Sequence, residues 1–237
     1  MQRIRIATVA LVAVLAVSAV AASSAFATEP YWKVNGTYLE SGSVNVSATN
    51  SGNFKLKAGS LITIECTSAT SKGVITGGLP GTDNSKITFS GCTVTQDPTT
   101  CEVKSPKKEN GETAAKGEIY TEAKTELVLN STQTKVLDLF TPESGTTFVE
   151  LVVSGTKCPS LTKGTNKVEG SVAAEVSPEG SEAATGKLIF PTTAIKTVFL
   201  GSTETPVGLT VFGIIECIQS GTENVTLTGG GEFGAYL

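Results

Sequence analysis

Carboxylates are the side chains of this sequence with the most capacity for chemistry, because histidine is absent and both arginines lie within the first five residues. A hydrolytic triad needs a base whose pKa lies near the working pH, most often histidine. Two carboxylates can suffice for glycoside hydrolysis if they flank a cleft. Glu65 and Glu216 each precede a cysteine in an apolar segment, and the strand parity of Asp138 predicts partial burial. The interpretation that we prefer for all three is an ordinary solvent-facing or edge position.

Motifs for nucleophilic, cofactor or metal chemistry are missing from the sequence. The nucleophile elbow G-x-S-x-G does not occur, and S-x-x-K recurs without the ordered partner motifs of a serine–lysine enzyme. The glycines of residues 180–187 are spaced one residue too far apart for a phosphate loop. Zinc would need a C-x-x-C pair or histidines, and a calcium loop would need clustered aspartates. We therefore expect no catalytic residue, no cofactor and no metal site.

The five cysteines could form disulfides, and their number is odd. The segment from Cys92 to Cys101 can fold as a hairpin that turns near Gln96 and Asp97, which would bring its two cysteines directly opposite each other. We therefore predict a disulfide between Cys92 and Cys101. A second disulfide would join two of the other three cysteines and leave one free thiol, with the pairing open. These three are Cys66, Cys158 and Cys217.

The first 27 residues predict export. Arg3 and Arg5 precede an uncharged stretch over residues 6–22, and a small-x-small peptidase site ends at Ala27. An uncleaved anchor is the alternative, but a spanning helix needs about 20 apolar residues. Cleavage after Ala27 would leave 210 residues with a formal net charge of −6 and no stable membrane span. A secreted or envelope location permits disulfides, and the acidic chain lacks the basic surface that nucleic acid requires.

The segment after the cleavage site predicts a β-hairpin. Asn35-Gly36 is a preferred two-residue turn, which would pair Val34 with Thr37 and place Lys33 and Tyr38 together on the other face.

Aromatic residues of this hairpin are candidates for contact with a ligand or partner. They are Tyr31, Trp32 and Tyr38. The alternative that we prefer for Trp32 is an anchor to the core, because tryptophan is highly buried on average.

Short alternating segments separated by glycine, serine, threonine and asparagine predict strands throughout the mature chain, among them Lys86–Val94, Leu209–Ile218 and Asn224–Leu227. We expect an all-β fold, an antiparallel β-sandwich or barrel-like domain preceded by an N-terminal hydrophobic signal helix.

An internal echo suggests that residues 28–237 contain two related β halves that meet near residue 130. Ile64-Glu65-Cys66 recurs as Ile215-Glu216-Cys217, and each is followed by Thr-Gly-Gly after about ten residues.

Several short blocks of the mature chain occur in a recognisable order. They begin at Trp32–Gly36 and continue with Phe89–Cys92, Cys101, Gly117–Thr121, Val136–Leu139, Pro142–Glu150 and Gly170–Val172. Together they resemble a group of bacterial secreted β-rich proteins without an established activity. The resemblance implies export and β structure and adds no mechanism.

These observations predict a secreted or cell-envelope-associated β-sandwich module that binds or supports other molecules and is not an enzyme. Its partner would be an envelope polymer or a protein. The alternative function is a carboxylate-dependent, carbohydrate-active enzyme, which would need a cleft with two carboxyl groups about 5–10 Å apart.

Overall fold

A computed structural model describes residues 29–237 of the protein, so the predicted signal helix and the cleavage after Ala27 lie outside the described residues. The described chain is almost entirely antiparallel β-structure, as expected, with one short 3-10 turn, η1 (Ser160–Thr162). The strands are β1 (Tyr31–Val34), β2 (Thr37–Tyr38), β3 (Ser43–Asn50), β4 (Phe54–Ala58), β5 (Ile62–Thr76), β6 (Thr82–Val94), β7 (Cys101–Lys104), β8 (Ile119–Asn130), β9 (Val136–Pro142), β10 (Thr147–Gly155), β11 (Gly164–Ser177), β12 (Gly186–Phe190), β13 (Thr197–Leu200), β14 (Thr203–Pro206), β15 (Gly208–Val211), β16 (Ile215–Leu227) and β17 (Phe233–Tyr236).

Eight of these strands close into a hydrogen-bonded ring. Going round it, β8 pairs with β9, β9 with β11, β11 with β12, β12 with β16, β16 with β3, β3 with β5, β5 with β6, and β6 with β8 again. Because side chains alternate across a strand, every second residue points into the ring. Closure leaves these eight strands without a free edge along their paired lengths.

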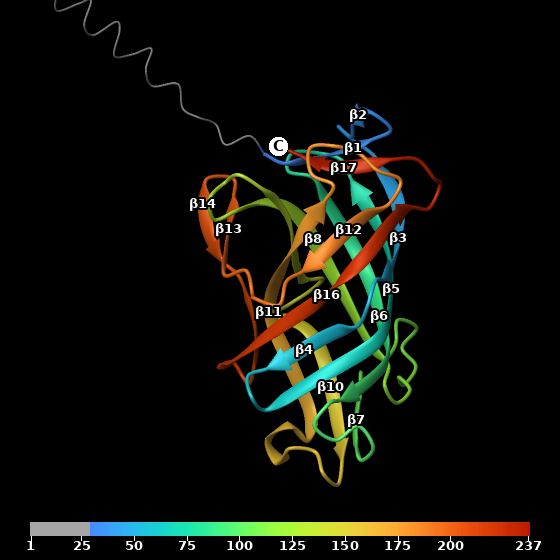
Figure 1. Ribbon diagram of the computed structural model, residues 1–237, viewed down its shortest axis with the longest axis vertical. Coiled ribbons are helices and arrows are strands. Elements are labelled where there is room, and N and C mark those ends of the chain that lie inside the picture. Colours follow the sequence, from blue (N-terminus) through green and yellow to red (C-terminus); the bar gives the residue numbers. More distant parts are fainter. Residues whose placement is uncertain (1–28) are drawn as a thin grey trace, which may run out of the picture.

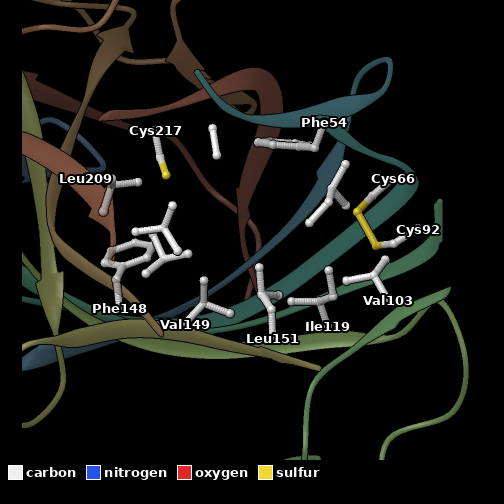
Figure 2. Close-up of a cluster of buried hydrophobic side chains, with 14 of the residues drawn as sticks. Phe54, Cys66, Cys92, Val103, Ile119, Phe148, Val149, Leu151, Leu209 and Cys217 are labelled. Carbon is white, nitrogen blue, oxygen red and sulfur yellow. A yellow bond between two sulfur atoms is a disulfide. The ribbon is translucent and has the colours of Figure 1, made fainter. Parts of the chain in front are cut away.

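Four long strands, β5, β6, β11 and β16, extend beyond the ring and form a second half of the body. There β4 lies between β5 and β16, β15 lies between β11 and β16, and β10 lies between β11 and β7. This half encloses the largest apolar cluster, which includes Phe54, Phe148 and Leu209. Figure 2 shows the Cys66–Cys92 disulfide on one side of this cluster and the Cys217 thiol on the other.

A three-stranded sheet of β17, β1 and β2 closes the free end of the ring; it is called the cap below. The predicted hairpin is confirmed: Val34 pairs with Thr37 and Lys33 pairs with Tyr38. Asn35 and Gly36 have φ values of 51° and 79°, as a two-residue hairpin turn requires. The cap packs through Trp32 on the apolar side chains at this end of the ring. Trp32 is only 3% exposed.

The hairpin of β13 and β14 adds a second layer outside the ring. Val198 is completely buried there, against the outward-facing side chains of β8, β9 and β11. Where this hairpin packs, both faces of the three strands are covered, so that their sequences are apolar at both parities there, as in Val136–Phe140 apart from Asp138.

The predicted disulfide between Cys92 and Cys101 is wrong. Cys92 stands directly opposite Cys66 in the ladder between β5 and β6, and these two are bonded. The segment after Cys92 does not turn back as a hairpin, because β7 pairs with β10 instead and thereby brings Cys101 to Cys158. In the chain-entropy account, loops of this size make each bond worth about 3–4 kcal/mol.

Cys217 is the free thiol, as an odd number of cysteines requires. It is buried in the cluster of Figure 2, and burial raises the pKa of the thiol to about 11. A thiol that stays protonated at neutral pH is a poor nucleophile.

The two echoing segments lie on opposite sides of one strand. Glu65 of β5 pairs with Lys55 of β4, whereas Cys217 of β16 pairs with Ala58 on the other edge of β4. That the sequence consists of two related halves meeting near residue 130 stays a prediction.

Helices that could cross a membrane were sought over residues 29–237, and none is long and apolar enough.

Candidate functional site

Two of the acids singled out by sequence are ordinary surface residues. Glu65 accepts a hydrogen bond of 2.7 Å from Asn53 Nδ2, which lowers its pKa, and lies 3.6 Å from Lys55 Nζ. Glu216 forms an exposed ion pair with Lys196. The surface interpretation of Glu65 and Glu216 is therefore confirmed.

Asp138 lies inside the ring, so the surface interpretation that we prefer from sequence is wrong for this residue, and the alternative suggested by its strand parity is right. Its residue is 1% exposed. Thr125 projects into the ring from β8, and Asp83 is its direct partner on β6. Asp138 is on β9, the other neighbour of β8, one inward-facing position further along. The ring therefore brings two carboxyl groups and a hydroxyl together in its interior.

The environment of Asp83 and Asp138 favours neutral carboxyl groups. Burial is the main cause for both. It raises the pKa of Asp83 to about 6, although the nearby polar groups of Thr125 and Asp138 act in the opposite direction. It raises the pKa of Asp138 well above its usual range, and repulsion from Asp83 adds to the effect. Burial and repulsion thus both favour the neutral form of Asp138.

Glu223 is a third carboxyl group in the ring. It faces inward from β16 at the parity of Val225 and Leu227, and its residue is 3% exposed. Burial raises its pKa to about 7, although hydrogen bonding with Ser71 opposes the shift. One ring thus holds three carboxyl groups with raised pKa values.

A cavity of about 30 Å³ separates the cap from these carboxyl groups, with Trp32, Asp83 and Asp138 in its lining. Trp32 Nε1 and Asp138 Oδ1 are both buried without a hydrogen-bond partner. Thr125 Oγ1 likewise makes no hydrogen bond of standard geometry, although it is close enough to both aspartates to lower their pKa values. A space of this size takes a water molecule or two and excludes a sugar ring. The buried pair therefore cannot act on a glycan.

An open groove of about 440 Å³ crosses the outer face of β6, β8 and β9. Its lining includes Glu126 and Glu143 as well as Lys124 and several threonines. Burial, followed by repulsion from Glu29, raises the pKa of Glu126. The volume is within the range of ligand pockets, but no aromatic side chain lines the groove to stack on a sugar.

The aromatic residues proposed from sequence divide between core and surface. Trp32 is buried, so its assignment as a surface contact is wrong and the core-anchor interpretation is right. Tyr31 and Tyr38 are half-buried, and their rings meet edge to face with centroids 5.0 Å apart. Tyr31 also stacks on Tyr236, over which Lys33 places its ammonium group. The tyrosines mainly brace the cap.

Large exposed apolar side chains gather in the half of the body away from the cap. Leu161, Phe212 and Ile214 are 71%, 47% and 84% exposed. The loops that carry them meet, because Thr162 and Phe212 line the same small cavity as Leu61. Leu161, Phe212 and Ile214, with the half-buried Leu61, are called the apolar tip below.

Phe212 has an unusual backbone conformation. It and Gly213 form the turn between β15 and β16 with φ values of 57° and 69°. This region is strained for a bulky residue and suits asparagine or glycine. The turn was missed by sequence because Leu209–Ile218 has strong β propensity throughout, and Gly213 was the one local signal against a continuous strand.

Comparison with known proteins adds no assignment: no family model, no curated protein and no solved structure matches the chain. Within residues 29–237, three or more acidic or cysteine side chains do not converge in a way that could hold a metal ion.

Proposed function

We propose that the protein is an exported, non-catalytic, barrel-like β module that binds a component of the cell envelope through its apolar tip. The observation that supports this most is the exposure of Leu161, Phe212 and Ile214 on loops that meet. Clustered exposed apolar residues on a soluble domain usually mark an interaction site. The disulfides and the closed ring give these loops a rigid support.

The carboxylate-dependent enzyme remains the second candidate, because Glu126 and Glu143 line one open groove. Its weakness is the lack of aromatic residues in that groove and of a histidine anywhere in the chain. Two carboxylates are sufficient for this chemistry only if they flank the bond to be cleaved.

One set of experiments separates the two functions. The exported protein, residues 28–237, should co-sediment with envelope fragments, and Ile214→Ser should release it. Leu79→Ser is a matched control, because Leu79 is 57% exposed and lies outside the apolar tip. A panel of glycoside, ester and peptide substrates should show no turnover. Turnover that Glu126→Gln abolishes would establish the enzyme instead.

A further inference from the structure

We infer that the apolar tip docks on an anionic lipid bilayer and inserts its side chains into the interfacial region. This inference rests on the proposed function and names the partner for the same surface. The argument uses the geometry of three loops, their charge and the conformation of Phe212.

The three loops come from different parts of the chain and meet in the half of the body away from the cap. They follow β4, β10 and β15, at residues 59–61, 156–163 and 212–214. Gly59 N donates a hydrogen bond of 3.1 Å to Glu216 O, which ties the first loop to the start of β16, two residues after the third loop. Leu61, Thr162 and Phe212 share one cavity, which joins the second loop to both. Separate apolar side chains on converging loops can enter a bilayer surface together.

The charge of these loops differs from that of the whole chain. They contain Lys157 and Lys163 and no acidic residue, although the mature chain has a formal net charge of −6. Lys163 Nζ donates to Thr156 O within its own loop, and Lys157 is 3.9 Å from Asp97 with its side chain 72% exposed. Lysines beside exposed apolar residues suit an anionic lipid surface. Two copies joined at this tip would bring the same lysines together, which argues against self-association.

Phe212 supports a role for the side chain itself. A turn with two positive φ values folds more easily with asparagine at the first position, as the Asn35-Gly36 turn of the same protein shows. Strained backbone tends to occur at functional positions. An aromatic ring beside Ile214 combines an interface-seeking group with an aliphatic one, which is the composition of membrane-surface elements.

Vesicle co-sedimentation of the exported protein tests the inference. We expect binding to equimolar phosphatidylcholine and phosphatidylglycerol, and weaker binding to phosphatidylcholine alone. Ile214→Ser and Phe212→Asn should each lower partitioning by about tenfold, whereas Leu79→Ser should leave it unchanged. Lys157→Gln with Lys163→Gln should lower binding to the anionic vesicles by about tenfold and hardly affect the neutral ones. A salt concentration of about 0.5 M should weaken the anionic component.

The outcomes separate the two proposals. Equal binding by wild type and Ile214→Ser, with unchanged thermal unfolding of the variant, would overturn the lipid inference. Loss of vesicle binding with retained, tip-dependent binding to delipidated cell-wall polymer would overturn the lipid inference and keep the binding module. If neither material binds, both proposals fail.

Discussion

The Asn35-Gly36 and Phe212-Gly213 turns have nearly the same φ values but opposite surroundings. Asn35 Oδ1 accepts a hydrogen bond of 3.0 Å from Glu232 N, so its side chain supports the turn. No side-chain hydrogen bond supports the second turn, and Phe212 presents almost half of its surface to solvent. At the cap, asparagine is a residue that readily adopts a positive φ. At the apolar tip, a bulky phenylalanine is held at a positive φ that it rarely adopts. Stability therefore accounts for the residue at the first turn and does not account for the residue at the second.

Removing the cap's anchor should have the largest effect. Trp32→Ala deletes a buried ring that packs on Phe233 and covers the acid-lined cavity, so it should destabilise the protein by about 3–5 kcal/mol. Urea unfolding measures the loss. Ile214→Ser, which changes an exposed residue of the apolar tip, should cost well under 1 kcal/mol in the same assay. Similar losses at the two ends would contradict the contrast between them.

Raising the pH should lower the free energy of unfolding through the acids of the ring, whereas the apolar tip contributes no such acid. Asp83, Asp138 and Glu223 have folded-state pKa values above their unfolded ones. The contributions of Asp83 and Glu223 are therefore fully present below about pH 4 and are lost as the pH rises through about 6 to 7, and Asp138 acts in the same direction. Glu223 alone should account for roughly 3 kcal/mol.

Chemical unfolding from pH 4 to pH 8 checks this expectation. Glu223→Gln should flatten the decline between pH 5 and 7, because the amide does not ionise. A decline of the same size in the variant would exclude Glu223 as its cause. Surface carboxyl groups with lowered pKa values, such as Glu65, have the opposite effect: their contribution to stability is lost as the pH falls, mostly below pH 4.5.

Exchanging the first residues of the two turns tests whether each turn requires the residue that it has. Asn35→Phe loses the hydrogen bond from Glu232 N and puts a bulky residue at positive φ, so it should cost about 2 kcal/mol. Thermal or urea unfolding measures this change. A neutral substitution would show that the cap tolerates the strain seen at the apolar tip.

The reverse exchange should have the smallest effect on stability. Phe212→Asn relieves strain of about 1–2 kcal/mol but loses the partial burial of the ring, so the net change should stay within about 1 kcal/mol. The same unfolding assay applies, with Asn35→Phe measured beside it. Destabilisation by more than about 2 kcal/mol would show that Phe212 is mainly a packing residue.

Local chemistry made parts of the fold predictable. The Asn35-Gly36 register followed from turn preference, and the parity of Asp138 with Val136 and Phe140 indicated its burial. The Cys92–Cys101 prediction failed because it considered only the short loop between them. Cys92 instead faces Cys66 across the pairing of β6 with the preceding strand β5, and the pairing of β7 with β10 brings Cys101 to Cys158, just after β10.

The buried acids show the same limit. Glu223 could have been found, because it shares the parity of Val225 and Leu227 in a strand that extends further back than predicted. Asp83 lies just before the predicted strand Lys86–Val94, so its inward direction became clear only when β6 was seen to begin at Thr82. The closeness of Asp83 and Asp138 depends on which strands become neighbours of β8, which sequence spacing does not determine.

The pairing of β1 with β17 places a constraint on the order of folding. Trp32 pairs with Ala235, so the cap joins residues about as far apart in sequence as the described chain allows. Contacts between such distant segments carry the largest cost of loop closure and tend to form late. A growing chain that lacks Phe233 lacks one of the side chains that pack against the Trp32 ring. The body can assemble from its nearer hairpins first, and the last strand to arrive seals the acids away from water.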